Sequence, residues 1–561
     1  MTTRSILQVF ENYQKARLTF VQTVADLALR SQNNEIMKKA NILGKFAVCY
    51  VRNMTFIEII YCRFTETFGR LVHSDSDMAM ELIEIGFLPT LLQNATSGNK
   101  YQKAAVLFVL RSICRHNEKL AEIVVKNGGL QTFVYCLEDF EPTVKESAAW
   151  GIGYISRHSK KLAQECVNNG ILPLLMLCLQ EPEISLKQIA TSAVADIAKH
   201  CEDLAMCVGD AGIVPHLVNN LRNSDEKLKR QSLAALSAIA KHSSELAEVV
   251  VEAEIFPTVL QHLSHPCPVV RRNAAAVIRD ISKQSQELTQ LVVNSGGIAA
   301  LLQIILQQPS KEFDLNNDAR MPCVTALGFI AGHSPQLSMT VIGCRTVQSL
   351  VGILNSSSDD SLLIATTWAL GQIGKHSPEH SQAVASTNVF QRLMELYERP
   401  ESSADLKAKC QNTLKLCLQN CLLISALEPL LFQAPPEILK YVLGQYSKSR
   451  DLNRAYISVP WAHTHICLLL KFLATMTVGE AVPVVNIGNN KIIIFTESQI
   501  FSFGTEKRSP PTSQAEFDFF STHLTSDAPP TFQICFRVKL GPISSGPAWF
   551  TSSLLCLVYA D

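Results

Sequence analysis

Apolar residues between positions 144 and 158 follow the spacing of a helix with one buried face. They recur at steps of three and four residues, which align side chains along one stripe of an α-helix. The stripe consists of Val144, Ala148, Ile152 and Ile155. A second amphipathic segment, LAQECV, stops at Asn169-Gly170, where glycine allows the left-handed backbone that ends a helix. After ILPLLMLCL and an acidic QEPE loop the pattern restarts, so we predict units of two helices with room for a short leading one.

This unit recurs with a period of 42 residues. The period links the residues at the end of the first helix, which are His116, His158, His200 and His242. It also links the glycines of the helix stop, which are Gly86, Gly128, Gly170, Gly212 and Gly296, with Glu254 filling the one gap. A fixed period in this range indicates a stacked repeat array. We therefore predict an all-α, right-handed α-solenoid.

The histidine series extends in both directions, with His73 upstream and Gln284, His333, His376 and Asn420 downstream. It predicts about nine repeats between residues 1 and 448. The step from Gln284 to His333 is 49 residues, and the extra residues fall in a polar stretch, which predicts a loop insertion near 309–321. Residues 41–70 are aromatic and β-branched, and they fit the repeat poorly.

The period stops after about residue 448. The tail, residues 449–561, contains Pro-Pro and Gly clusters and strand-like runs such as KIIIFTESQIFSFG. Three interpretations fit it: a small β-rich appendage, a poorly ordered segment, or the product of an incorrect gene model.

Charge and composition narrow the function classes. Lys plus Arg and Asp plus Glu both number 50, and zero net charge argues against a nucleic-acid binder. The 17 cysteines are scattered, without a CxxC pair, as in a reduced cytoplasmic protein. The N-terminus lacks a signal-peptide core, and the longest apolar runs are too short to span a membrane. We expect no membrane partner.

Sequence motifs for catalysis and cofactor binding are missing. There is no P-loop, GxSxG or HExxH, and Gly151-Ile152-Gly153 lies inside a predicted helix. Cys410, Cys417 and Cys421 have spacings that fit one helix face but have no histidine at ligand spacing. We expect no enzyme, no small-molecule substrate, no metal and no cofactor. Basic residues that precede the repeated histidines suit a helix C-terminus, so we interpret the histidines as structural.

Two sets of residues are candidates for partner binding. A basic ladder at the start of the first helix has the same 42-residue step and consists of Lys103, Lys145, Lys187, Lys229 and Arg271. It fits an acidic partner such as a microtubule surface, or it pairs with acids just upstream. The second set lies on the face of this helix in the expected groove: Trp150 with Tyr154, and Trp368 with Gln372. Their side chains are either exposed anchors for a peptide or buried between repeats.

The helices SAAWGIGYISRH and TTWALGQIGKHS resemble the armadillo repeat. Longer strings, among them LQVFENYQKARLTFVQTVADLA, CLEDFEPTVKESAAW, VVEAEIFPTVL and ALEPLLFQAPPEILKYVLGQYSK, resemble the sperm-associated antigen 6 family over residues 1–40 and 71–448. That resemblance implies a structural protein of the central apparatus in the axoneme of motile cilia and flagella. It implies partners among central-apparatus proteins and microtubules, and a role in ciliary and sperm motility.

A transport or signalling adaptor of the importin-α or β-catenin type is the alternative. Importin α captures basic peptides with a repeated Trp and an Asn four residues later. Here Trp150 is followed by Tyr154 and Trp368 by Gln372, so the Asn partners are missing. This makes the axonemal interpretation the stronger one.

Overall fold

The computed structural model describes residues 3–28, 30–45, 58–306, 319–435 and 438–445, and the strand residues 484–487, 490–493, 516–517 and 538–539. Its contacts divide the chain into two units, Met1–Asn420 and Cys421–Asp561. The division therefore falls before the boundary at 448 that the end of the period suggests. The repeats described below all belong to the first unit.

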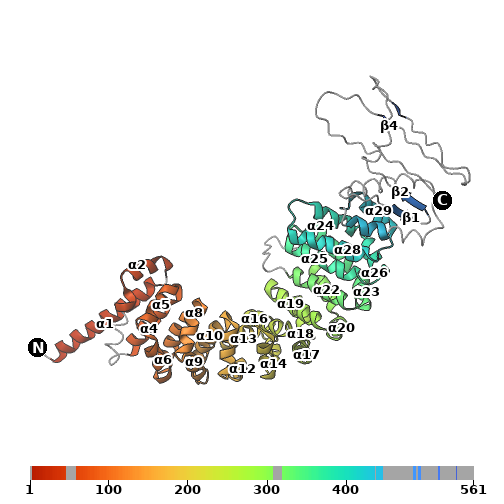
Figure 1. The fold of residues 1–561 in the computed structure, drawn as a ribbon. Coiled ribbons are helices and arrows are strands. Elements are labelled where there is room, and N and C mark those ends of the chain that lie inside the picture. The colour runs from red at the N-terminus through yellow and green to blue at the C-terminus, as the bar shows by residue number, and fades with distance from the viewer. Residues whose placement is uncertain are drawn as a thin grey trace, which may run out of the picture. The chain divides into compact units, whose positions relative to one another are not determined.

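The first unit is an α-solenoid in which one long helix per repeat packs against the long helix of the next (Figure 1). Within the described residues nine long helices follow one another in this way after the N-terminal helix α1 (Thr3–Leu27). They are α4 (Glu58–Ser74), α7 (Lys100–His116), α10 (Pro142–His158), α13 (Ile184–Ala198), α16 (Glu226–Ala240), α19 (Pro268–Gln284), α22 (Arg320–His333), α25 (Asp360–Gly374) and α28 (Ala404–Leu418).

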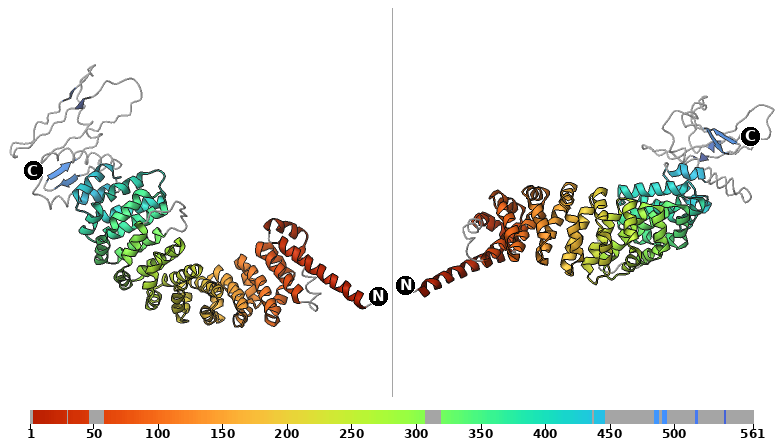
Figure 2. Two further views of the ribbon diagram at one scale, coloured as in Figure 1. Left: turned by 180° about the vertical axis from the view of Figure 1, so that it is seen from behind. Right: turned by 90° about the horizontal axis from the view of Figure 1, so that it is seen from below.

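Two shorter helices lie between successive long helices, so each repeat has three helices, including the short one for which the sequence left room (Figure 2). The first of each pair is α5 (Ser76–Glu84), α8 (Glu118–Lys126), α11 (Lys160–Asn168), α14 (Glu202–Asp210), α17 (Ser244–Glu252), α20 (Gln286–Asn294), α23 (Pro335–Gly343) or α26 (Pro378–Ala385). The second is α6 (Leu88–Ser97), α9 (Gly129–Leu137), α12 (Ile171–Gln180), α15 (Val214–Asn220), α18 (Ile255–His262), α21 (Gly297–Leu306), α24 (Thr346–Ser356) or α27 (Val389–Glu398).

The predicted apolar stripe is the core of the array. Val144, Ala148, Ile152 and Ile155 of α10 are all fully buried. Burying a side chain of this size contributes about 1.5–3 kcal/mol for Val or Ile. Because α10 packs against both α7 and α13, its stripe joins the cores of neighbouring repeats. The apolar core is therefore continuous along the stack.

The helix stop predicted from glycine spacing is confirmed. Gly170 has a φ of 73° between α11 and α12, a backbone that other residues adopt at a cost. Glu254, which fills the gap in the glycine series, adopts the same left-handed conformation with a φ of 56°. The stacking therefore imposes this conformation even on a side chain that disfavours it.

Part of the atypical segment 41–70 is a regular member of the array, contrary to the sequence expectation. Residues from Glu58 onward form α4, which packs against α1 and α7 as the other long helices do. Phe64 and Phe68 are buried there, and the ring of Phe68 lies 5.0 Å from that of Phe87. Phe64 occupies a position that is mostly small in other repeats, as at Ala148. Phe68 occupies one that is aliphatic, as at Ile152, and these larger rings hide the repeat pattern. Residues 46–57 lie outside the described residues.

Two further expectations fall largely on residues that are not described. The loop insertion near 309–321 overlaps residues 307–318, which are outside the described part, and α22 begins at Arg320. In the second unit the structure describes α29 (Ile424–Gln433) and two antiparallel pairs of short strands. The pairs are β1 (Val484–Ile487) with β2 (Asn490–Ile493), and β3 (Glu516–Phe517) with β4 (Val538–Lys539). The rest of the tail is not described, so its interpretations stay predictions.

Candidate binding face of the stacked helices

The repeated histidines connect each long helix to the one before it. The Nε2–H of His158 donates to the backbone carbonyl of Cys114, 2.7 Å away in the last turn of α7. Carbonyls in the last turn of a helix lack a partner within that helix. The same bond is made to Val72 by His116, to Ser156 by His200, to Ala198 by His242, to Ala240 by Gln284, to Ser282 by His333, to Ala331 by His376 and to Lys375 by Asn420.

We call this series of bonds the carbonyl ladder. It gives the histidines a structural role, but the role is to donate a hydrogen bond to the preceding long helix and not to place a positive charge at a helix C-terminus. A neutral imidazole already supplies the N–H donor, and Gln284 and Asn420 supply an amide N–H at the same place. Burial lowers the pKa of His242 and of His376, which favours their neutral form. His73 is not part of the carbonyl ladder. The residue that aligns with His116 is Ser74, one position later, and His73 contacts Ser112 and Arg115.

The first two residues of the basic ladder are ion-paired within the stack. Lys103 Nζ lies 2.8 Å from Asp139, and both side chains are only 14% exposed. Lys145 Nζ lies 2.5 Å from Glu181. The sequence predicted pairing with acids just upstream of each lysine. The structure shows that each lysine pairs with an acid 36 residues downstream, in the turn before the next long helix. Such partly buried bonds between charged groups contribute about 1.5–3 kcal/mol each.

The remaining ladder residues are placed differently. Lys187 and Lys229 are partly exposed, and neither has an ion pair within the described part of the chain. Arg271 donates from Nη1 to the backbone carbonyls of His265 and Pro266, at 2.7 and 2.9 Å. Its positive charge is therefore held in place by neutral acceptors.

The aromatic candidates on the long helices are partly exposed, between the two alternatives that the sequence left open. The rings of Trp150 and Tyr154 stack with centroids 5.3 Å apart on α10. Trp368 of α25 meets Phe329 of α22 edge-on at 4.9 Å. Gln372 accepts a hydrogen bond from Lys375 at 2.7 Å. A side chain added at Gly328 would come within 2.4 Å of the Trp368 ring, so this glycine makes room for the tryptophan.

Arg111 belongs to the same face and was missed by the sequence analysis. Its guanidinium carbon lies 5.1 Å from the Phe108 ring centre on α7 and 5.8 Å from that of Trp150 on α10. Burial lowers its pKa, and it has no ion pair within the described residues. The spacing of Phe108 and Arg111 by three residues on one helix was a signal that pointed to this contact. A cation between two aromatic faces joins α7 to α10.

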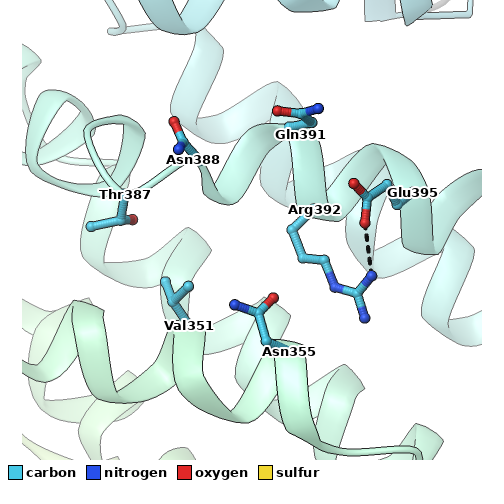
Figure 3. A pocket seen from close by; sticks show the side chains of 7 residues that line it. All are labelled: Val351, Asn355, Thr387, Asn388, Gln391, Arg392 and Glu395. Carbon is cyan, nitrogen blue, oxygen red and sulfur yellow. Dashed lines mark hydrogen bonds and ion pairs between the residues drawn. The ribbon is translucent and has the colours of Figure 1, made fainter.

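A depression lies between α24 and α27 (Figure 3). Arg392 of α27 lies beside it and donates to the Leu354 carbonyl at 3.2 and 3.1 Å and to Glu395 at 2.7 Å. The charge and donors of Arg392 are thus used between neighbouring repeats. The depression is an inter-repeat seam, and none of the residues proposed from the sequence lines it.

Within the described ranges, no group of three or more His, Cys, Asp or Glu side chains has the arrangement of a metal site. Cys410 and Cys417 are buried in α28, but Cys421 follows the end of that helix at Leu418, so the three cysteines do not share one helix face as the sequence suggested. No single helix in the described part is long and apolar enough to cross a membrane. Three helix pairs reach that length only together, and they bend by 81°, 71° and 71° at α11–α12, α20–α21 and α23–α24.

Comparisons with known proteins agree with this architecture. A family model for the Armadillo/beta-catenin-like repeat matches residues 201–241, and a HEAT repeat model matches residues 255–285. An engineered protein of known crystal structure covers 73% of this chain and 98% of its own, with a TM-score of 0.63 at 18% identity. That likeness concerns the fold alone. The helical array is an all-α solenoid of armadillo type.

Two curated relatives share a shorter stretch. Sperm-associated antigen 6 of Mus musculus and that of Homo sapiens are each 50% identical to this chain over 95 residues. The match covers 17% of this chain and 19% of either relative, so the chain spans about a fifth of their length. Beyond the matched stretch, the wider resemblance noted in the sequence stays a prediction. The findings support an armadillo-repeat scaffold that binds proteins.

Proposed function

We propose that this protein is a non-enzymatic scaffold of the axonemal central pair, needed for ciliary and sperm flagellar motility. The observation that carries the proposal is the 50% identity with sperm-associated antigen 6 over 95 residues. The expected location is the cytoskeleton of the cilium or flagellum within the cytoplasm. The expected partners are central-apparatus proteins and microtubules.

The fold suits this task because a solenoid presents a long surface in place of one enclosed site. Its long helices follow one another in contact from α4 to α28. Two clusters on these helices are the candidate binding groups: Arg111 with Trp150 and Tyr154 near one end, and Phe329 with Trp368 near the other. These side chains are partly exposed, and aromatic residues and arginine are the types that most often dominate protein interfaces.

Fractionation of ciliated cells tests the proposal. Tagged full-length protein should remain with axonemes after the membrane is removed with detergent. A fully soluble or nuclear distribution would contradict it.

The Trp150→Ser variant tests whether the aromatic face holds the protein there. Serine occupies the equivalent position of the next repeat, at Ser192, so the helix accepts it. The variant should fold and be released from axonemes, because it removes the ring that stacks on Tyr154 and Arg111. Leu177→Ser, at an exposed residue of α12, is a matched control that should stay bound.

A further inference from the structure

One position of the repeat, in the turn before each long helix, carries an acidic side chain in some repeats and a neutral one in others. It lies 36 residues after each ladder lysine, the interval of the two observed ion pairs. The four residues at this position are Asp139, Glu181, Asn223 and His265. The ladder thus faces two acids, then an amide, then an imidazole.

Three of these residues close the same local turn before a long helix. Asp139 Oδ1 accepts the backbone N–H of Glu141 at 3.0 Å, and Asn223 Oδ1 accepts that of Asp225 at 2.9 Å. His265 Nδ1 accepts the N–H of Cys267 at 3.1 Å. The turn therefore does not need an acid. Loss of the acid changes what the ladder cation meets and leaves the local backbone bond in place.

As a result, the first two lysines of the basic ladder have a carboxylate partner and the next two do not. Lys103 and Lys145 are paired, whereas Lys187 and Lys229 have no ion pair within the described residues. Asp225, four residues before Lys229, is engaged by Gln188 Nε2 at 2.8 Å and by the N–H of Leu228 at 2.6 Å. A partly buried cation without a counter-ion is in a costly state that an incoming anion relieves.

Further basic groups gather around Lys229. Arg271 is tied to the carbonyl of His265, and the rings of His262 and His265 lie parallel with centroids 5.9 Å apart. Burial, then the charges of Lys229 and His262, hold the pKa of His265 below its usual value, and Glu226 is the one carboxylate that acts against them. His262 is only 5% exposed, and its Nε2 has no hydrogen-bond partner among the described residues. Because the lowered pKa of His262 and of His265 keeps these two imidazoles neutral near pH 7, the positive charge here comes from Lys229 and Arg271.

We propose that Lys187, Lys229 and Arg271 bind a carboxylate-rich segment of a partner protein, laid across the starts of α13, α16 and α19. The inference deepens the proposed scaffold function and rests on it. Long helices in contact are about 8–10 Å apart. A peptide in the polyproline II conformation has about three residues per turn and rises about 3.1 Å per residue, so carboxylates at every third residue lie on one face about 9 Å apart and match the three cations.

A direct binding measurement tests the inference. The probe is a fluorescent 12-residue peptide with Glu at every third position, about one carboxylate per 9 Å in the polyproline II conformation. Its control has Gln at the same places. Full-length protein should bind the Glu peptide and not the Gln control. Added salt should weaken the binding, because it screens interactions between exposed charges. Lys187→Gln with Lys229→Gln should weaken binding by about tenfold or more, or about 1.4 kcal/mol.

Matched variants separate this site from general positive charge. Lys103→Gln with Lys145→Gln removes the paired half of the ladder and should change affinity less than about twofold, or about 0.4 kcal/mol. Lys126→Gln with Lys160→Gln, at exposed lysines of α8 and α11, serves the same purpose if the first control unfolds. Equal affinity for both peptides, equal loss in all three variants, or tighter binding of an oligonucleotide of equal charge would overturn the inference. Axonemal retention is measured separately and can succeed whether or not the peptide binds.

Discussion

The repeats around α7 and α10 and those around α13 and α16 share one backbone plan and differ in how they treat the same lysine. In the first pair the lysine is locked to an acid of the next repeat, as in Lys103 with Asp139. In the second pair the acid has been replaced, and the turn keeps its bond through Asn223 or His265. The difference teaches that the turn stabilises the stack by its backbone bond, and that the charge at this position is free to serve either stability or binding.

The largest expected effect is the loss of the ion pair in the first region. Asp139→Ala removes the bond to Lys103 and the turn bond to Glu141, and should lower local stability by about 2–3 kcal/mol. Asn223→Ala removes one neutral bond and should cost about 1 kcal/mol. Native-state hydrogen exchange in α7–α10 and α13–α16 measures both. Asp139→Asn, which keeps the turn bond, should fall between them, and equal costs for the two alanine variants would break the comparison.

A smaller effect follows from making the second region resemble the first. Asn223→Asp with His265→Asp places a carboxylate 36 residues after Lys187 and Lys229, as in the observed pairs. Stability should rise by about 0.5–1 kcal/mol per pair, and the Glu peptide should no longer bind. His265→Asn is the neutral control and should still bind the peptide. Undiminished peptide binding by the double variant would show that these lysines are not the contact.

The smallest expected effect is a difference in acid sensitivity. Burial lowers the pKa of His262 and of His265, so the unfolded chain binds protons more tightly at these residues. Stability around α18 is then full above about pH 6.5 and declines as the pH falls below it. Burial alone would raise the pKa of Asp139, but its hydrogen bonds from Lys103 and Glu141 hold it below the usual value. The stability that ionised Asp139 contributes is therefore fully present above about pH 3.9 and is lost as the pH falls through its lowered pKa.

Hydrogen exchange from pH 7 to 4, corrected for the intrinsic rate, checks this order. Peptides from α18 and α19 should lose protection before peptides from α9 and α10. Loss of protection in the reverse order would contradict it.

The solenoid was predictable because its signals lie within one repeat. The 42-residue step of the histidines, the apolar stripe around Ile152 and the stop at Gly170 are local patterns that stacking preserves. Even the substitution of Gln284 for a histidine was placed at the right position, and it makes the same bond.

Contacts between repeats were not predictable in the same way. Lys145 was expected to pair with acids just upstream, but its partner Glu181 lies in the next repeat. The 36-residue separation of the two partners depends on how neighbouring repeats stack, and the sequence of a single repeat does not contain that information. Arg111 was missed for the same reason, since Trp150 belongs to the neighbouring helix. The helix from Glu58 onward was missed because phenylalanine occupies core positions that hold small or aliphatic residues in other repeats.

The carbonyl ladder has a consequence for how such a chain tolerates change. His158 and Cys114 are 44 residues apart, whereas His333 and Ser282 are 51 apart, yet both bonds are 2.7 Å long. The alignment of one long helix with the next is therefore set by this bond at the helix ends, and it does not depend on the length of the chain that connects them. Insertions in the connecting loops can accumulate, or be engineered as attachment sites for tags and new domains, without the modules losing alignment.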